Sequence, residues 1–435
     1  MSQKSKSKNV SRRNFVKLSS TAAAASALAG PLSAINPIIQ ATGSDIIRVG
    51  LIGCGGRGTG AATNALQSAE GIEIVALADV FENKVATARG RLEKSKHGAS
   101  VKVTDKSCYT GIDSYKKLID NQSVDLVIHT TSPAFRATHL ERAVAAGKHN
   151  FIEKPGCVDV AGYHRVLTAE AEAKKKNLAI VTGTMFRRSN NYADAVNGIH
   201  DGLIGDIVFA QARYCSGGIW YRKRNKSMTD MEYQLNNWYH FVWLSGDQIV
   251  EQAVHNIDAM NWVMGGPPVR AFGSGGQRNR PDDSEIYDSM SIDFEYANGA
   301  TVSFMCRQQP GKNQVSNKVV GTKGVAHIPP FGVSTIKSHD GEKLLRSKYK
   351  PDAYTIEHTH LMASIRAGNP IIEATEMLDS SLTAVMGRLA AYTGQEVTWD
   401  FLTKKSKLNL MPDDIDKDTN VAFGEPARPG KTRLV

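Results

Sequence analysis

The sequence has few cysteines, five among 435 residues, and none of them forms a C-x-x-C pair. The odd number argues against a disulfide framework, and the missing pairs argue against a structural zinc site. The sequence also lacks an apolar run of the ~20 residues that a membrane-spanning helix requires. We therefore expect neither a disulfide-stapled scaffold, nor a zinc module, nor a stable membrane anchor.

Acidic residues are absent from the first 44 positions, which hold six lysines and arginines. These six residues account for more than half of the net charge of +10, so the rest of the chain is only weakly basic. No basic helix and no arginine stripe interleaved with aromatic residues follows. We therefore expect no nucleic-acid partner.

The basic N-terminal stretch contains the pattern Ser11-Arg12-Arg13-Asn14-Phe15, and a mild, alanine-rich segment follows over 18–32. This order predicts a signal peptide of the twin-arginine export route over residues 1–41. Cleavage after Ala34 and cleavage after Ala41 both fit. The predicted location is the periplasm, or another compartment reached by this route.

A dinucleotide site is predicted where the apolar run 46–52, typical of a buried parallel strand, meets a glycine-rich turn and a helical pattern over 59–68. In such a turn the first glycine permits a tight bend, the second lets the backbone approach a pyrophosphate, and the third lets the helix pack on the strand. The free N–H groups of the helix favour phosphates. The residues expected to contact the cofactor here are Gly53, Cys54, Gly55, Gly56, Arg57 and Gly58.

A second strand, 72–78, ends at Asp79, which lies 21 residues beyond Gly58. A carboxylate in this place accepts the adenosine ribose hydroxyls and repels a 2′-phosphate, so it predicts NAD rather than NADP. Two alternatives stay open. Arg57 can tolerate a phosphate, and Asp79 can instead be the acid of a turn or helix N-cap.

Helical and strand patterns continue to alternate up to residue 185, which predicts a doubly wound parallel sheet of the Rossmann type over 45–185. Ligands of such sheets bind at the carboxyl ends of the strands. Thr130 and Lys154 lie at such ends. Further helices are expected over 114–121, 135–146 and 160–175, and further strands over 124–129, 149–152 and 178–185.

The pattern changes after residue 185, and short strand candidates separated by turns predict an antiparallel sheet in an α/β domain over 186–435. The polar tail from Leu410 is expected to contact a neighbouring subunit of a homo-oligomer. Strands are expected over 206–214, 286–296, 299–308, 317–321 and 325–328, and helices over 250–263, 355–367 and 376–392.

Several segments together resemble the glucose-fructose oxidoreductase / inositol dehydrogenase (Gfo/Idh/MocA) family, over nearly everything after residue 45. The resemblance implies a Rossmann domain followed by an α/β domain with a large, mostly antiparallel sheet, and substrates that are sugars or polyols. The matching segments are Val49–Gly55, Thr131-Ser132-Pro133 with His139, Ala146–His149, Glu153-Lys154-Pro155, Gly246-Asp247 with Glu251, His255 and Asp258, and Val320–Gly324.

The resemblance also implies roles for single residues. Lys154 would be the catalytic lysine and His255 the proton-transfer residue. Thr130, Ser132, His139, Glu153 and Lys154 would contact the cofactor. The family usually has an aspartate four residues before the histidine, whereas this sequence has Glu251, so the substrate is the property least safely transferred.

The residues themselves fit the removal of a hydride from an alcohol. A histidine can take the hydroxyl proton near neutral pH, and a lysine can polarise the reacting oxygen. On the helix expected over 250–263, Glu251 and His255 share a face, so that Glu251 can orient the imidazole or hold a substrate hydroxyl. A buried structural histidine and a solvated lysine are the alternatives. Glu251, His255 and Asp258 could also be metal ligands. No cysteine or further histidine has a spacing that would complete such a site, so we expect no metal.

Residues 214–245 are rich in tyrosine and tryptophan, whose faces suit the C–H faces of sugar rings, although core packing or a subunit contact also explains most of them. We expect Arg187, Trp238 and Asp258 to border the substrate.

Three functions follow from the sequence. The first is an NAD-dependent oxidoreductase acting on a ring hydroxyl of a sugar, glycoside or polyol. Its cofactor is expected to stay tightly bound, because no soluble NAD pool exists in the periplasm. The second is a redox-neutral NAD-dependent glycosidase, although the Tyr-Pro-Thr-His-Gly segment of one such branch is absent. The third is a non-catalytic sugar-binding protein, against which Lys154 and His255 argue.

Overall fold

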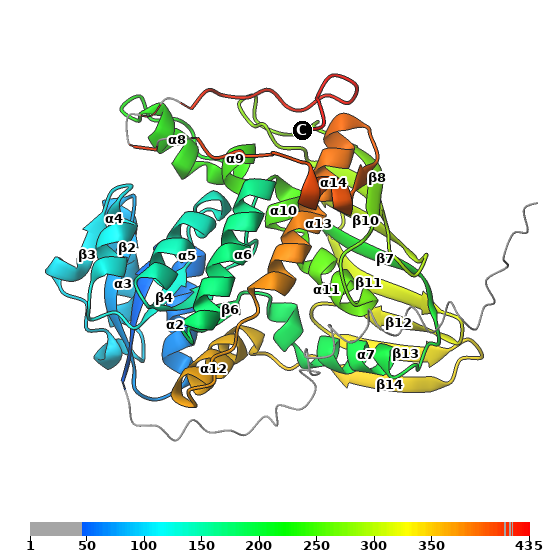
Figure 1. Ribbon diagram of the computed structural model, residues 1–435, viewed down its shortest axis with the longest axis horizontal. Helices are drawn as coiled ribbons and strands as arrows, with labels where there is room; N and C mark the ends of the chain where they lie inside the picture. The colour runs from blue at the N-terminus through cyan, green and yellow to red at the C-terminus, as the bar shows by residue number, and fades with distance from the viewer. Residues whose placement is uncertain (1–45, 413–414, 417–418, 420) are drawn as a thin grey trace, which may run out of the picture. The chain divides into compact units, whose positions relative to one another are not determined.

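The computed structural model describes residues 46–435 except 413–414, 417–418 and 420. The predicted signal peptide lies outside the described residues. The first part of the described chain forms a six-stranded parallel sheet in the order β3-β2-β1-β4-β5-β6 (Figure 1). Its strands are β1 (Ile47–Ile52), β2 (Ile72–Asp79), β3 (Cys108–Thr110), β4 (Leu126–His129), β5 (His149–Ile152) and β6 (Ile180–Thr182).

This sheet confirms the predicted doubly wound arrangement. β1 pairs with β2 on one side and with β4 on the other, so the strand order reverses at the carboxyl end of β1. A crevice at such a reversal is where open α/β sheets bind ligands. The helices of this part are α2 (Gly56–Ser68), α3 (Glu82–Glu93), α4 (Ser114–Asp120), α5 (Arg136–Ala145) and α6 (Val160–Lys175).

The second sheet has nine strands in the order β14-β13-β12-β11-β7-β10-β9-β8-β15. Only β7 and β10 run parallel, so the sheet is mostly antiparallel, as predicted. Its strands are β7 (Ile207–Ser216), β8 (Arg270–Gly276), β9 (Ser289–Glu295), β10 (Thr301–Gln308), β11 (Gln314–Gly321), β12 (Gly324–Ile328), β13 (Val333–Ser338), β14 (Lys343–Lys348) and β15 (Val397–Thr398).

Alternating side chains give this sheet one buried face. In β9, Met290, Ile292 and Phe294 are buried while Ser291 and Asp293 are exposed. β8, β13, β14 and β15 were not predicted, because β8 is rich in glycine, β13 is short and half polar, β14 is a polar edge strand and β15 has two residues. The helices of this part are α7 (Asn190–His200), α8 (Asp230–Asn236), α9 (Val242–Ser245), α10 (Gln248–Glu251), α11 (Val254–Met264), α12 (Ala353–Arg366), α13 (Ala374–Thr393) and α14 (Trp399–Lys404).

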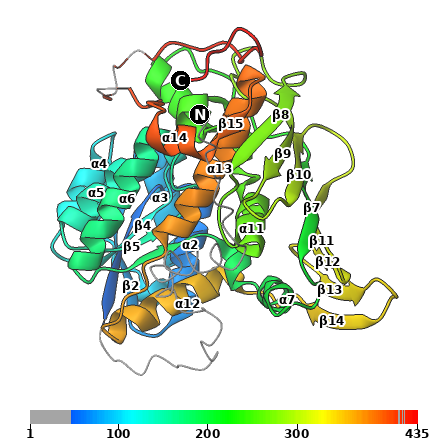
Figure 2. The same cartoon turned by 45° about the vertical axis from the view of Figure 1, so that its right-hand side comes forward.

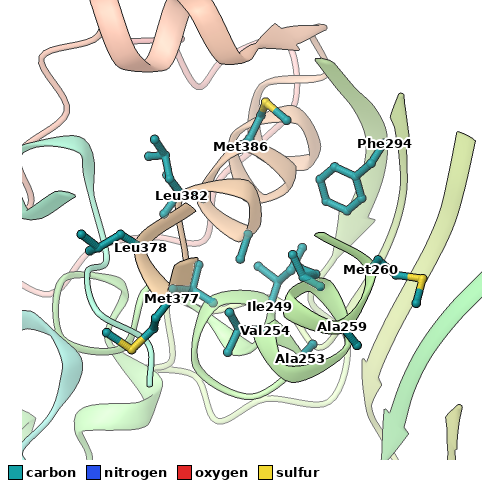
Figure 3. Close-up of a cluster of buried hydrophobic side chains, with 14 of the residues drawn as sticks. Ile249, Ala253, Val254, Ala259, Met260, Phe294, Met377, Leu378, Leu382 and Met386 are labelled. Atoms are coloured by element: carbon teal, nitrogen blue, oxygen red, sulfur yellow. The ribbon is translucent and has the colours of Figure 1, made fainter. Parts of the chain in front are cut away.

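Helix α13 lies between the two sheets in both ribbon views (Figures 1 and 2). It packs against α6 of the first part, against α11 and against β8 and β9 of the second sheet. Its apolar side chains, among them Met377, Leu378, Leu382 and Met386, belong to one buried cluster with Ile249 and Phe294 (Figure 3). A single apolar core therefore joins the two parts of the chain.

Helix α12 returns to the first sheet after the chain has built most of the second. Leu361 and Met362 are buried in the same cluster as the residues of β1 and β2. Asn64 of α2 donates a hydrogen bond to the Thr355 hydroxyl at 3.2 Å, and the Thr359 hydroxyl donates to the carbonyl of Ser68 at 3.2 Å. One of the helices that cover the first sheet therefore comes from a late part of the sequence.

None of the helices in the described part of the chain is both long and apolar enough to cross a bilayer.

Buried histidines are a feature of the core around the first sheet. Burial lowers the pKa of His129 to about 4 and that of His358 to about 3. His129 shares a hydrogen bond of 2.9 Å with Asn150, and His358 stacks on Phe151 with ring centroids 4.1 Å apart. Both rings are therefore neutral in the folded protein near pH 7.

We predict that the protein loses stability as the pH falls below about 6.5. Between there and pH 4 the unfolded chain binds a proton at each of these histidines, whereas the folded chain does not, which costs about 1.4 kcal/mol per pH unit and histidine. In His129→Gln, the free energy of unfolding, measured by denaturant titration, should fall less steeply by that amount. His164→Gln, on the exposed side of α6, should keep the wild-type slope, and an unchanged slope in His129→Gln would contradict the prediction.

Candidate functional site

The glycine turn after β1 is sterically determined at two positions. Gly53 has a φ of +96°, and a Cβ there would lie 2.7 Å from the backbone of Thr130 and Thr131. A Cβ on Gly58 would lie 1.8 Å from the carbonyl oxygen of Gly53. A Cβ on Gly55, in contrast, would meet no atom within 4 Å. The turn therefore packs tightly on its protein side and is open above Gly55.

Helix α2 begins at this open side without a side-chain cap and without an acid in its first turn. Its first N–H groups and the positive end of its dipole therefore remain available to an anion. The hydroxyl of Thr130 donates to the carbonyls of Ile52 and Gly53, at 2.9 and 2.7 Å, and so fixes the turn to the end of β4. A cradle of this kind fits the pyrophosphate of a dinucleotide.

Asp79 lies at the carboxyl end of β2, beside this turn. One carboxylate oxygen accepts the N–H of Cys54 at 2.7 Å, and the other accepts the N–H of Phe81 at 2.9 Å. Each oxygen retains a lone pair for a ribose hydroxyl. Asp79 thus serves the turn itself, which was one of the alternatives for it, and still faces the pocket.

The pocket beside the turn brings together many of the predicted cofactor residues. His139 is sandwiched between the rings of Tyr115 and Phe135, at centroid distances of 4.2 and 5.9 Å. Trp238, predicted to border the substrate, lines this pocket beside the glycine turn. Cys54 is buried beneath the turn, and its thiol donates to the carbonyl of Ala78. The predicted residues that line the pocket are Gly53, Gly55, Asp79, Thr130, Ser132, His139 and Trp238.

Arg57 contacts Glu153 and Tyr354. Its Nε donates to Glu153 at 2.5 Å, and its guanidinium lies 4.7 Å above the ring centre of Tyr354. Burial alone would lower the pKa of Arg57, but the charge and hydrogen bond of Glu153 raise it above the usual value. Arg57 is therefore an ion-pair partner of the segment that carries Lys154.

Lys154 meets Glu251 at the carboxyl end of β5. The ammonium group donates to the Glu251 backbone carbonyl and lies 3.3 Å from the carboxylate Oε1. Both side chains are 12% exposed. Since a lysine has three donors, one N–H remains for a reacting oxygen. Glu251 Oε2 is buried and has no hydrogen-bond partner among the described residues.

His255 does not share one continuous helix with Glu251, so that prediction is wrong. α10 ends at Glu251, and α11 begins at Val254 after a turn. The imidazole is half-buried and packs on Phe186, with ring centroids 5.2 Å apart. Burial lowers the pKa of His255 well below its usual value, and the positive charges of Lys154 and Arg57 lower it further. The ring is therefore neutral near pH 7 and able to accept a proton.

Arg136 is a site residue that the sequence analysis missed. It is buried at the start of α5 and donates to the carbonyls of Thr131 (3.1 Å) and Pro155 (2.5 Å). Burial lowers the pKa of Arg136 to about 10, although the charges of Glu153 and Glu251 oppose this. The sequence did contain a signal for its burial, because Arg136 lies on the same helix face as the apolar residues Leu140 and Val144.

Helix α13 fixes both chain segments that form the site. The Ser381 hydroxyl accepts the N–H of Gly156 at 3.0 Å, next to the Lys154-Pro155 pair. The Ser380 hydroxyl donates to Asp258 at 2.8 Å, one turn after His255. Arg388, fully buried, donates to the carbonyl of Gly246 at 3.0 Å, ahead of α10.

The other predicted substrate residues are held by one another. Asp258 is buried and accepts three hydrogen bonds from two nitrogens of Arg187, at 2.8–3.1 Å. The Asp258 carboxylate is thus engaged within the protein. In the described part of the chain, no three His, Cys, Asp or Glu side chains are grouped so that they could hold a metal ion.

Together, an open glycine turn, an uncapped helix end and a carboxylate at the end of the second strand define a dinucleotide-binding α/β protein. Two family models match this chain. One, described as an oxidoreductase family with an NAD-binding Rossmann fold, covers residues 47–181. The other, described as the GFO/IDH/MocA C-terminal domain, covers residues 192–327. The chain therefore belongs to the GFO/IDH/MocA family of oxidoreductases, and its cofactor is NAD.

Individual relatives are distant. An inositol 2-dehydrogenase of Salmonella typhimurium is 25% identical over 347 residues, which cover 78% of this chain and 91% of that protein. A glycosyl hydrolase family 109 protein of Shewanella baltica is 26% identical over 245 residues, which cover 53% of this chain and only half of that protein. The fold is similar to the aldose-aldose oxidoreductase of Caulobacter crescentus, with a TM-score of 0.65, 20% identity, and 81% and 99% of the two chains covered.

We predict different effects for two substitutions in the glycine turn. Gly55→Ala places its methyl group in open space, so the fold should be unchanged, but NAD affinity should fall at least tenfold, about 1.4 kcal/mol. Gly58→Ala forces the turn apart and should reduce the free energy of unfolding by about 1–3 kcal/mol. Calorimetric unfolding and fluorescence titration with NAD measure both effects. If Gly55→Ala bound NAD with the affinity of the wild type, the pyrophosphate would not lie over Gly55, and the prediction would be wrong.

Proposed function

We propose that this protein is an NAD-dependent oxidoreductase that moves a hydride to or from a ring hydroxyl carbon of a sugar, glycoside or polyol, with tightly bound NAD. One observation carries the proposal. Lys154, with one donor to spare, sits beside Glu251 and close enough to a neutral His255 to lower its pKa. The Arg57–Glu153 ion pair ties this group to the glycine turn.

The residues divide the proton chemistry between them. NAD, when bound, accepts or supplies the hydride. Lys154 donates a hydrogen bond to the reacting oxygen and stabilises negative charge there. His255 takes the hydroxyl proton in the oxidation and returns it in the reduction. Both groups come from segments fixed to α13, so their positions do not depend on the substrate.

A polyhydroxylated substrate fits the unused acceptor of the site. Within the described part of the chain, Glu251 Oε2 is buried without a hydrogen-bond partner, and such an atom is costly unless a ligand supplies a donor. A hydroxyl on the carbon next to the reacting one would supply it. The similarity to an inositol 2-dehydrogenase supports this substrate class.

A redox-neutral glycosidase is the second candidate, because the chain is also similar to a glycosyl hydrolase family 109 protein. The same lysine and histidine would serve there, since oxidation of one ring carbon makes the neighbouring C–H acidic enough for elimination of the glycosidic oxygen. The two candidate functions differ in their products. The oxidoreductase releases a keto-sugar, whereas the glycosidase releases the sugar cut from its glycoside.

We further propose that the protein is exported through the twin-arginine route and forms a homo-oligomer. The twin-arginine pattern at Arg12-Arg13 supports export. Because this route carries folded proteins, NAD can be loaded in the cytoplasm.

We predict that Lys154→Ala and His255→Ala each lower turnover about 10²- to 10⁴-fold, as expected for loss of a general acid–base group, while NAD remains bound. Turnover is measured by steady-state kinetics, and bound nucleotide by mass spectrometry of the denatured protein. Lys175→Ala and His164→Ala, both on α6 and exposed, are the matched controls. Full turnover in either site variant would remove that residue from the mechanism.

Product analysis should separate the two candidates. The purified holoenzyme is incubated with inositols, free sugars and aryl glycosides, and the products are identified by mass spectrometry. We expect a keto-sugar or keto-polyol together with an equal amount of reduced nicotinamide. Release of the aglycone without net reduction of NAD would instead support the glycosidase.

A further inference from the structure

The nucleotide pocket has a wall that does not come from the first sheet. Beside Asp79 and Phe81, its lining includes Leu235 and Trp238. These two belong to the segment 229–245, which we call the cap and which contains α8 and α9. A dinucleotide whose adenosine lies beside Asp79 would therefore contact residues from both parts of the chain.

The cap is packed as firmly as a core element. Met231, Tyr233, Phe241 and Leu244 are at most 1% exposed. They form a separate apolar cluster in which the cap packs on residues at the carboxyl ends of the Rossmann strands. Those residues are Val80, Phe81, Ile112, Ala134 and Phe135.

The end of the chain holds the cap from the other side. Gln234 donates to the carbonyl of Val421 at 2.6 Å and accepts the indole N–H of Trp243 at 2.7 Å. Phe423 packs on Phe241, with ring centroids 5.7 Å apart. In Figure 1 the red C-terminal segment runs along α8 and α9.

A second link joins the same two segments. The carboxylate of Glu285 accepts the N–H of Val242 at 2.8 Å and that of Gly424 at 2.7 Å. Burial raises the pKa of this carboxyl, although both N–H donors oppose the shift. Lifting the cap would thus break hydrogen bonds in a buried place and expose the aromatic cluster.

We propose that the cap, fastened by residues 421–424, encloses the adenosine half of NAD and keeps the cofactor from exchanging with solution. The proposal rests on the proposed function in that it takes NAD to lie in this pocket. It assigns Trp238 and Leu235 to the cofactor and names the contact, Gln234 with Val421, that must open before NAD leaves.

The test measures exchange of bound NAD in the holoenzyme. Protein carrying NAD is mixed with excess isotopically labelled NAD, and the bound nucleotide is followed by mass spectrometry without substrate. Gln234→Leu removes the link to Val421 but does not line the pocket. It should exchange at least tenfold faster than the wild type. Lys223→Ala, at an exposed position in the loop before the cap, should stay within twofold of the wild type.

Other results would overturn the proposal. Exchange within seconds in the wild type, or wild-type exchange in a folded Gln234→Leu, would show that the cap does not retain NAD. If Gln234→Leu does not fold, Phe423→Ala, on the tail side of the cap, is judged by the same tenfold criterion. A wild-type protein that binds no NAD at all would refute the proposed function, which is distinguishable from rapid exchange in an active enzyme.

Discussion

The burial of α13 is the constraint on which the site depends. This 20-residue helix has apolar neighbours from both sheets, so its burial joins the two parts into one core. Three of its polar side chains hold the chain segments that form the site. Ser381 holds the segment after Lys154, Ser380 holds Asp258, and Arg388 holds the chain before α10. Close packing here transmits position from the core to the reacting groups.

Gly387 shows how tight this arrangement is. A Cβ there would lie 2.8 Å from the ring of Phe294 in β9, so α13 approaches the second sheet without an intervening side chain. Gly156 has the same role on the other side, since its Cβ would lie 2.7 Å from Met377. Glycines thus set how near the lysine and histidine segments come to the same helix.

The charges of the site are paired rather than solvated. Arg57 with Glu153, Lys154 with Glu251, and Arg187 with Asp258 form three ion pairs, each with at least one largely buried partner. Buried ion pairs contribute little net stability, because the desolvation cost offsets the attraction. Their effect here is on position and on protonation. Burial keeps His255 neutral and the cations reinforce this by lowering its pKa further, while the Glu251 carboxylate and carbonyl hold the lysine in place.

The sequence supports prediction where the signal is local and fails where it depends on packing. The strand, turn and helix around Gly53–Gly58 follow from consecutive residues, and the structure has them as predicted. The break between Glu251 and His255 was missed because Val250, Val254 and Ile257 keep a helical period across it. The turn between α10 and α11 can be recognised only from the backbone of the structure.

Contacts between residues far apart in the sequence could not be predicted either, because they also depend on packing. Tyr354 stacks on Arg57 across almost three hundred residues, and no pattern near either residue marks the pair. Trp238 was predicted to border the substrate because aromatic faces suit sugars, and its place in the same pocket lining as Asp79 could not be read from the sequence near either residue. The type of a residue indicates which kind of contact it can make, but the fold determines which residue or ligand it contacts.

The late return of α12 has a consequence for biosynthesis. The Rossmann core buries Leu361 and Met362, so its apolar layer is incomplete until these residues have left the ribosome. A nascent chain that ends after β6 would leave the apolar surface beneath α12 exposed to solvent, where chaperones bind. The apolar core of the nucleotide-binding part is therefore completed only when most of the polypeptide has been synthesised.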